Sequence, residues 1–169
     1  MTSSAVEIER KYIIKLPKLS ELRSMPEYTE SEIEQIYLDA PKGETLRIRR
    51  RTWQGRIEYI ETRKIRIDKM SATELERSLT PEEYSALSER RLRGTLPIYK
   101  TRYTFRYEGQ TFELDVYPRW QRTCIMETEL PTRDTAVKFP EFIEIIREVT
   151  GIKEYSNAGM SRAFPDEDT

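Results

Sequence analysis

The stretch Glu7-Ile8-Glu9-Arg10-Lys11-Tyr12 decides the fold class of this 169-residue chain. In an extended segment successive side chains point to opposite faces, so Glu7, Glu9 and Lys11 share one face while Ile8 and Tyr12 share the other. A single segment of this kind is typical of an edge strand with a solvated face. The same alternation recurs along the chain, and this repetition favours a sheet with one charged face.

Seven further segments alternate in the same way, separated by turn sequences such as Gln54-Gly55 and Glu108-Gly109. With the first, the predicted strands cover 5–15, 32–40, 44–53, 56–67, 71–79, 98–108, 110–119 and 123–131. Eight strands in hairpin order predict a mainly β fold, either an antiparallel barrel or a sandwich. We expect a single domain over 1–169, because the chain is long enough for one sizeable core and too short for two ordinary ones.

A few helices are expected beside the strands. The sequence Thr80-Pro81-Glu82-Glu83 supplies an N-cap, a proline at the first helical position and a glutamate three residues after the cap, and it predicts a helix that ends near Gly94. Apolar residues at helical spacing predict a second helix over 140–149, and a weaker signal lies near 18–24. The acidic end, 166–168, is expected to be a frayed tail within the final segment 161–169.

Composition excludes several function classes. The chain has no histidine and a single cysteine, so Ser-His-Asp and Cys-His catalysis, the usual zinc sites and an internal disulfide are excluded, and Cys124 is expected to be a packing residue. Lys and Arg number 29 against 30 Asp and Glu, and without a basic excess no nucleic acid partner is expected. No long apolar run and no leader-like segment are found, so we expect no membrane partner and a cytoplasmic location.

Like charges repeat two residues apart on several predicted strands. The acidic repeats are Glu7/Glu9, Glu74/Glu76, Glu113/Asp115 and Glu127/Glu129, and the basic positions are Arg47/Arg49, Lys64 and Lys100/Arg102. A solvated sheet face that pairs acids with bases across strands is the alternative interpretation, but it does not need such repeats, which cost energy. Mg²⁺ or Mn²⁺ between the carboxylates would remove that cost, and the basic strands would then bind a polyanion. Inside a closed barrel these charges would require a water-filled interior.

In this order the motifs closely resemble the CYTH superfamily, also called triphosphate tunnel metalloenzymes. The resemblance spans about 6–160. Each motif is short and unspecific by itself, but eight of them occur in the order of the family. They are Glu-x-Glu-x-Lys (Glu7, Glu9, Lys11), Gln-x-Tyr-Leu (Gln35, Tyr37, Leu38), Arg-x-Arg (Arg47, Arg49), Thr-x-Lys (Thr62, Lys64), Lys-x-Arg-Tyr (Lys100, Arg102, Tyr103), Glu-Leu-Asp-Val (Glu113 to Val116), Glu-x-Glu (Glu127, Glu129) and Tyr-Ser-Asn (Tyr155, Ser156, Asn157).

The resemblance implies an eight-stranded antiparallel closed barrel, a tunnel that binds a triphosphate and one or two Mg²⁺ or Mn²⁺ ions. It assigns metal binding or water orientation to Glu7, Glu9, Glu74, Glu76, Asp115, Glu127 and Glu129, and substrate binding to Lys11, Arg47, Arg49, Lys64, Lys100 and Arg102. Glu7, Glu9 and Lys100 are the implied catalytic residues. The chain departs from the family at Ala72, where relatives often have an arginine, and Arg66 and Lys69 lie nearby in sequence as substitutes.

The function implied is metal-dependent hydrolysis of a small triphosphate. Inorganic tripolyphosphate, cleaved to diphosphate and phosphate, is the first choice, since no aromatic cluster beside the basic strands suggests a site for a nucleobase or a thiazolium ring. An adenylate cyclase and a thiamine triphosphatase are the alternatives within the family. A non-catalytic polyphosphate or nucleotide-binding module is the alternative of another class, and the complete acidic motifs disfavour it. A homodimer is a further expectation, because apolar strand faces outside the barrel need cover.

Overall fold

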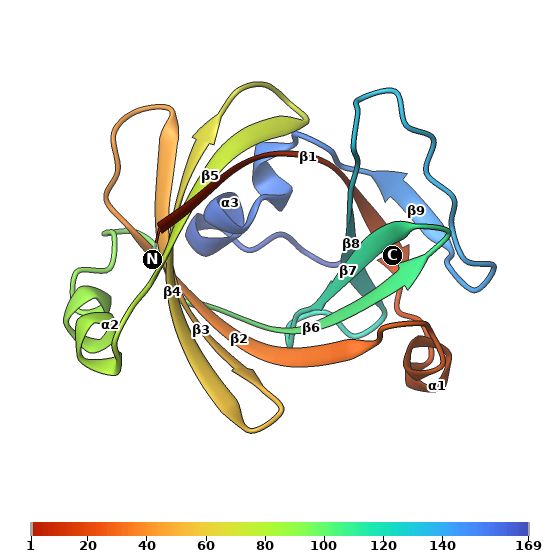
Figure 1. Ribbon diagram of the computed structural model, residues 1–169, viewed down its shortest axis with the longest axis horizontal. Helices are drawn as coiled ribbons and strands as arrows, with labels where there is room; N and C mark the ends of the chain where they lie inside the picture. Colours follow the sequence, from red (N-terminus) through yellow and green to blue (C-terminus); the bar gives the residue numbers. More distant parts are fainter. Residues whose placement is uncertain (1, 169) are drawn as a thin grey trace.

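Eight antiparallel strands close into a barrel in the computed structural model, which describes residues 2–168 (Figure 1). The closed barrel predicted from the sequence is therefore confirmed. In chain order the strands are β1 (Thr2–Lys15), β2 (Thr29–Leu38), β3 (Glu44–Trp53), β4 (Arg56–Arg66), β5 (Ser71–Ser78), β6 (Ile98–Tyr107), β7 (Gln110–Val116) and β8 (Thr123–Glu129). Around the barrel they follow the order β5-β4-β3-β2-β6-β7-β8-β1.

The long strand β1 closes the barrel. Its first half pairs with β5, where Val6 faces Thr73, and its second half pairs with β8, where Lys11 faces Glu127. Two of the hairpins turn at the predicted sequences Gln54-Gly55 and Glu108-Gly109, where all four residues have φ between 49° and 74°. A two-residue turn with positive φ at both positions matches the twist of the strands it joins, which explains the glycine at the second position.

The apolar faces of the strands point outward and are covered from outside. One cluster combines barrel residues such as Phe105 and Phe112 with Leu22 of helix α1 (Leu19–Arg23), close to the weak helix predicted over 18–24. Phe139 and Phe142 of the segment after β8 pack on the same cluster. Cys124 is fully buried within it, as expected for a packing residue. The exterior therefore carries most of the hydrophobic core, and the charged faces are left for the interior.

The second outer cluster lies under helix α2 (Pro81–Ser88). The capping box forms as predicted, because the Thr80 hydroxyl accepts from the Glu83 N–H at 3.1 Å and the Glu83 carboxylate accepts from the Thr80 N–H at 3.0 Å. The predicted end near Gly94 is wrong, since the helix stops at Ser88. Residue Leu92 instead donates its N–H to the carbonyl of Tyr37 at the end of β2, so a tertiary hydrogen bond replaces further helical turns.

The helix predicted over 140–149 is wrong. Residues Ile145–Glu148 form a ninth strand, β9, which pairs antiparallel with residues 12–14 of β1. The β5 partner of β1 ends at Ile8, so this edge of β1 is free beyond that point. Backbone groups on a free edge need hydrogen-bond partners, and the β-branched pair Ile145-Ile146 suits a strand, so the edge outweighs the helical spacing.

The chain then crosses one end of the barrel. The short 3₁₀ helix η1 (Lys153–Tyr155) leads into helix α3 (Asn157–Arg162), which is seen within the outline of the barrel in Figure 1. Met160 of α3 packs on inward-facing apolar residues such as Ile98 and Ile125, together with Tyr117 and Trp120. This cluster closes part of that end of the barrel.

The acidic end is not a frayed tail as expected. The carboxylate of Glu167 accepts hydrogen bonds from the N–H groups of Gln121, Arg122 and Thr123, at 2.5–3.1 Å. These bonds hold the pKa of Glu167 low, at about 2, against the opposing effect of desolvation. Asp168 pairs with Arg147 of β9 at 2.9 Å. The final segment is therefore fastened across the end of the barrel that α3 covers.

Candidate active site

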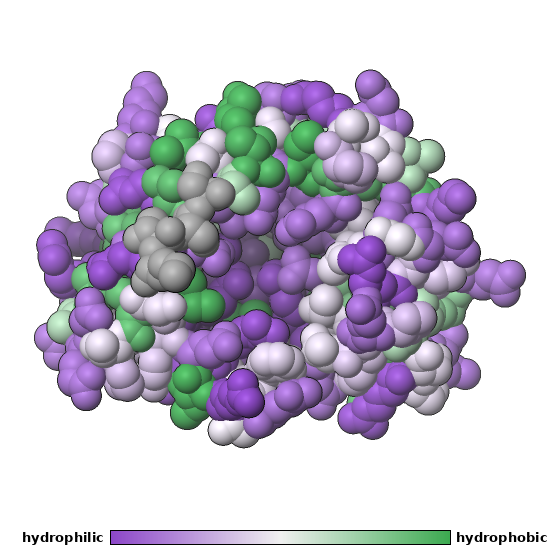
Figure 2. Space-filling view, in the orientation of Figure 1, coloured by the Kyte–Doolittle hydropathy of each residue, from purple (hydrophilic) through white to green (hydrophobic). Residues whose placement is uncertain are grey.

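A cavity of about 410 Å³ occupies the interior of the barrel. Figure 2 shows its mouth as a hollow lined by hydrophilic residues. Seven carboxylates and seven basic side chains line it, a composition opposite to that of an ordinary protein interior. The acids are Glu7, Glu9, Glu74, Glu76, Glu113, Glu127 and Glu129, and the bases are Lys11, Arg47, Arg49, Arg51, Lys64, Arg66 and Arg102.

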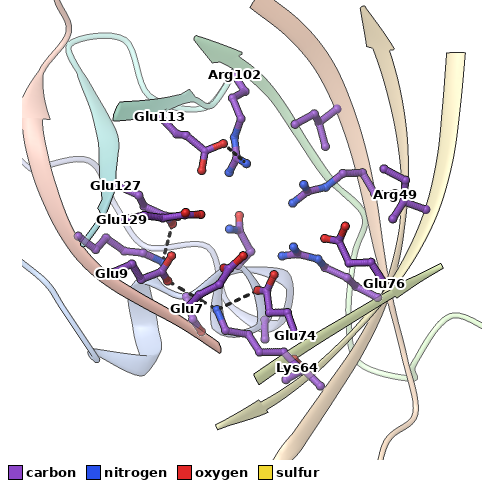
Figure 3. A pocket seen from close by; sticks show the side chains of 18 of the residues that line it. Glu7, Glu9, Arg49, Lys64, Glu74, Glu76, Arg102, Glu113, Glu127 and Glu129 are labelled. Carbon is purple, nitrogen blue, oxygen red and sulfur yellow. Dashed lines mark hydrogen bonds and ion pairs between the residues drawn. The ribbon is translucent and has the colours of Figure 1, made fainter. Parts of the chain in front are cut away.

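Most of the carboxylates gather on the part of the wall built by β1, β5 and β8 (Figure 3). The register explains this, because Glu9 of β1 faces Glu129 of β8 across the ladder. Two lysines lie among them. The Lys64 ammonium is 3.6 Å from a carboxylate oxygen of Glu9 and 3.6 Å from one of Glu74, and Lys11 is 3.1 Å from Glu127.

This crowding shifts the carboxyl pKa values upward. Burial, together with the neighbouring carboxylates Glu74, Glu129 and Glu9, raises the pKa of Glu7 to about 8. The Glu127 charge and burial raise the pKa of Glu9, and burial and nearby acids raise that of Glu129. Glu127 behaves differently, since Lys11 and Arg102 outweigh burial and hold its pKa well below the ordinary value. A cation placed among Glu7, Glu9 and Glu129 would therefore be strongly favoured.

The opposite part of the wall carries arginines. Arg47 and Arg49 of β3 point into the cavity, and in the described part of the chain neither has a carboxylate within ion-pairing distance. Gln35 orients Arg49, because its side-chain oxygen accepts from the Nε and Nη2 of Arg49 at 3.1 and 2.6 Å. Burial and the charges of Arg47 and Arg102 lower the pKa of Arg49 to about 9. Guanidinium groups held without counter-charges favour an anionic ligand.

The donor set suits a hard divalent cation. All the acidic groups offer oxygen, the atom that Mg²⁺ and Mn²⁺ prefer, and the described lining contains no histidine or cysteine. No three carboxylates of residues 2–168 already converge on one point. The lysines explain this arrangement, since Lys64 occupies the space between Glu9 and Glu74. The residue types therefore fit a metal ion, and Lys64 would have to withdraw from between these two carboxylates as the ion binds.

Of the site residues predicted from the sequence, eleven line this cavity. They are Glu7, Glu9, Lys11, Arg47, Arg49, Lys64, Glu74, Glu76, Arg102, Glu127 and Glu129. The structure does not bring Lys100 and Asp115 to the cavity surface. Their side chains are 0% and 1% exposed, and they form an ion pair that is enclosed inside the barrel beside the cavity. Tyr37, of the Gln-x-Tyr-Leu motif, lines the cavity and is also largely buried, with 6% exposed.

Three charged lining residues were not among the site residues assigned from the sequence, although one of them, Arg66, was named as a substitute for the missing arginine. Arg51 and Glu113 continue the two-residue period of Arg49 and Asp115, so the period carried a signal for them, but it does not show where along a strand the cavity begins. Arg66 is the third, and its Cα lies opposite Ala72 in the β4–β5 ladder. It is therefore placed beside the position where an arginine was expected, whereas Lys69 is not part of the lining.

The floor of the cavity includes Ser156, Asn157 and Ala158, at the start of α3. Asn157 accepts a hydrogen bond from the hydroxyl of Tyr117 at 2.9 Å, which ties the helix to the apolar cluster below. The Lys11 ammonium donates to the carbonyl of Tyr155 at 3.3 Å. Of the predicted Tyr-Ser-Asn motif, Ser156 and Asn157 therefore line the site, and Tyr155 contributes its backbone carbonyl.

The family model of the CYTH domain matches residues 5–164. The chain belongs to the CYTH domain family. The match covers the barrel strands from residue 5 of β1 onward, together with α3, so the charged cavity lies within it. A comparison of this CYTH protein with curated proteins gives no match.

Several solved structures resemble this CYTH protein. The inorganic triphosphatase NE1496 is 26% identical, with 94% of this chain and 96% of that chain covered and a TM-score of 0.58. The PH1819 protein from Pyrococcus horikoshii OT3 is 27% identical, with 76% and 80% covered and a TM-score of 0.55. A putative adenylate cyclase from Bacillus halodurans is 18% identical, with 78% and 83% covered and a TM-score of 0.50, a likeness of fold alone.

The helices of this CYTH protein are short. Within residues 2–168 none combines the length and the apolar character that a helix needs to cross a membrane.

Proposed function

We propose that this CYTH protein hydrolyses a small triphosphate, most simply inorganic tripolyphosphate, to diphosphate and phosphate with Mg²⁺ or Mn²⁺. The observation that carries the proposal is the division of one cavity into an acidic wall and a wall with arginines that have no carboxylate partners. A triphosphate bridged to the acids by cations satisfies both walls at once. The similarity to an inorganic triphosphatase over 94% of this chain supports the same substrate class.

The metal would be held by the cavity carboxylates Glu7, Glu9, Glu74, Glu76, Glu127 and Glu129. A bound Mg²⁺ or Mn²⁺ supplies charge neutralisation and a bound water of lowered pKa. Asp115, which the resemblance also suggested as a ligand, is left out because Arg102 and Lys100 occupy its oxygens. The number of ions, one or two, belongs to the proposal as well.

The side chains of the protein position the substrate and stabilise the developing charge. Arg47 and Arg49 bind non-bridging phosphate oxygens from one side of the cavity. The ammonium groups of Lys11 and Lys64 stabilise the developing negative charge from the acidic side. A water oxygen attacks the terminal phosphorus, and the bond from that phosphorus to the bridging oxygen breaks. The diphosphate leaves with the bonding electrons. A carboxylate of the acidic wall takes the proton of the water, and phosphoryl transfer needs no covalent intermediate here.

A substrate panel tests the proposal. Tripolyphosphate, ATP and thiamine triphosphate are supplied separately with Mg²⁺ or Mn²⁺, and phosphate, diphosphate and cyclic AMP are measured. We expect phosphate release, with kcat/KM for tripolyphosphate at least about tenfold above that for ATP and thiamine triphosphate. The adenosine and thiamine groups of those substrates would find few contacts in this charged lining. Among the described lining residues Tyr37 is the one aromatic side chain, so a nucleobase has little to stack on.

Each other outcome has a definite meaning. Cyclic AMP from ATP would establish the cyclase alternative, and preferred cleavage of thiamine triphosphate would establish that triphosphatase. Tight binding of tripolyphosphate with no product at any pH from 7 to 10 would establish the non-catalytic binding module. A cytoplasmic location is part of the same proposal.

Arg66 offers a second test, because it is an exposed cavity residue with no carboxylate partner in the described part of the chain. We expect Arg66→Ala to raise KM for tripolyphosphate about three- to tenfold with little change in kcat, as for loss of one charge-assisted contact at the edge of a site. Adding Ala72→Arg on the neighbouring strand should restore at least part of the affinity. The Cα atoms of the two positions are paired in the ladder, so an arginine at position 72 would begin directly beside the position of Arg66.

Arg63→Ala is the matched control for this experiment. Arg63 lies on the same strand but points away from the cavity, where it pairs with Glu44 at 2.6 Å. Its replacement should leave KM unchanged. An Arg66→Ala enzyme with the KM of the wild type would contradict a phosphate contact at this position.

A further inference from the structure

A buried ion pair lies inside the barrel next to the cavity, on the same strand faces as Arg102 and Glu113. The Lys100 ammonium donates to a carboxylate oxygen of Asp115 at 2.8 Å, and the two side chains are 0% and 1% exposed. Removing two charges from water costs several kcal/mol per ion, and apolar residues of similar volume often serve stability as well or better. This pair is therefore not explained by stability alone. Neither residue lines the cavity, so direct contact with a ligand does not explain it either.

The pair is joined to the cavity through Arg102. The Nε of Arg102 donates to one oxygen of Asp115 at 2.7 Å, and the Nη2 donates to the other at 2.9 Å. This bidentate geometry fixes the plane of the guanidinium group, which a single contact does not. Glu113 accepts from the Nη1 at 2.8 Å and holds the remaining edge. Arg102 itself lines the cavity (Figure 3), so its remaining N–H donors are available to a ligand there.

Lys100 also corrects the local charge. Arg102 faces two carboxylates, Asp115 and Glu113, and with these alone the group would carry a net negative charge. The ammonium of Lys100 brings the sum of the four charges to zero. Lys100 and Arg102 share one oxygen of Asp115, so the carboxylate stays ionised between two cations. The guanidinium group of Arg102 is consequently fixed in place, and the net charge of the four groups does not repel an anionic ligand.

We propose that Lys100 and Asp115 are positioning residues, which act on the substrate only through Arg102. This inference rests on the proposed function for its substrate, a triphosphate. It replaces direct phosphate contact or proton transfer by Lys100 with a chain of contacts from Lys100 to Asp115 to Arg102. Its direct consequence is that Lys100 and Asp115 matter only while Arg102 is present.

A double-mutant cycle tests this dependence. Lys100→Met, Arg102→Ala and the combined variant are compared by isothermal titration with tripolyphosphate in the presence of EDTA, and by KM and kcat with Mg²⁺ or Mn²⁺. We expect Arg102→Ala to weaken binding about tenfold or more and Lys100→Met about three- to tenfold, with kcat changing less than KM. In the combined variant the loss should equal that of Arg102→Ala alone. The pH profile of kcat in Lys100→Met should keep the shape of the wild type.

Multiplication of the two single effects would overturn the proposal, since Lys100 would then act on the ligand independently. A kcat that falls in Lys100→Met together with loss of one limb of the pH profile would overturn it in favour of proton transfer. If Lys100→Met does not fold, Asp115→Asn replaces it in the same cycle, with the same non-additivity expected. Arg77→Met is the control, because Arg77 makes a similar bidentate pair with Glu61 outside the cavity and should change no binding constant.

The titration separates this inference from the proposed function. A wild-type protein that binds tripolyphosphate but releases no phosphate refutes the hydrolase, and the binding cycle still decides the roles of Lys100 and Asp115. A wild-type protein that hydrolyses tripolyphosphate, with multiplicative effects in the cycle, supports the hydrolase and refutes the positioning role.

Discussion

Replacement of Glu7 by Gln is expected to lower kcat for tripolyphosphate about 10²–10³-fold, the loss typical of removing one group that stabilises the transition state. Glu7 lies among Glu9, Glu74 and Glu129, where a cation is most strongly favoured. Glutamine keeps the size of the side chain and removes its charge. Steady-state kinetics over a metal titration measure the effect, and higher metal concentration should restore only part of the activity.

The same replacement should stabilise the metal-free protein at alkaline pH. The native Glu7 carboxyl holds its proton up to a pKa of about 8, whereas its ordinary pKa is 4.5. The unfolded chain therefore binds fewer protons between these values, and the free energy of unfolding falls as the pH rises through this window. We expect the advantage of Glu7→Gln over the wild type to grow from pH 5 to pH 9 by about 1 to 2 kcal/mol, after a discount for partial solvent exposure.

Comparison of the two proteins isolates this effect. Burial lowers the pKa of Lys100 while the Asp115 charge opposes the shift, and whatever this pair contributes to the pH dependence is the same in both proteins. Thermal unfolding in EDTA over this pH range is the measurement. Glu61→Gln, on the outer face of β4, is the control and should show full activity. Wild-type activity in Glu7→Gln would remove Glu7 from the proposed metal site, and a pH-independent difference in stability would contradict its raised pKa.

Replacement of Arg49 by Gln should raise KM for tripolyphosphate up to about a hundredfold, because the variant loses a charge-assisted contact to the phosphates. Thermal stability should not fall in parallel. Burial and neighbouring cations already disfavour the charge of Arg49. The gain in stability from removing this charge therefore offsets the loss of the two hydrogen bonds that Arg49 donates to Gln35.

Arg50→Gln makes the same chemical change on the adjacent residue. Arg50 points outward, is 46% exposed and pairs with Glu34, so its replacement should change neither KM nor the melting temperature by much. An unchanged KM in Arg49→Gln would place the phosphates elsewhere in the cavity. A large loss of stability in Arg49→Gln would show that the arginine serves the fold more than the ligand.

Much of this site could be predicted because a strand has an exact period of two. Once Glu7, Glu9 and Lys11 share a face, burial of the opposite face decides which way all three point. Closure of the barrel then brings together strands that are distant in sequence, as in the pairing of Lys11 with Glu127. The hairpin turns and the α2 capping box are equally local, and they form where the sequence predicts them.

The sequence was misleading where a tertiary contact competed with a local pattern. The residues of β9 have helical spacing, but the free edge of β1 beyond Ile8 offers backbone hydrogen bonds that a helix end there would not provide. The acidic end was expected to be solvated, yet Glu167 finds three N–H donors at the start of β8. Such partners are created by the fold and leave no trace in the segment that uses them.

The sequence by itself determined the antiparallel strands and the two sets of charges, because alternation within each strand depends only on local backbone geometry. The closed barrel, as opposed to a sandwich, was implied by the resemblance to the CYTH family and not by alternation. Only the tertiary structure decided how deep each charge lies. Lys100 and Arg102 share a face and a motif, but Arg102 reaches the cavity while Lys100 is enclosed behind Asp115. Depth depends on strand tilt, on the floor formed by α3 and on neighbouring side chains, none of which the period of a single strand contains.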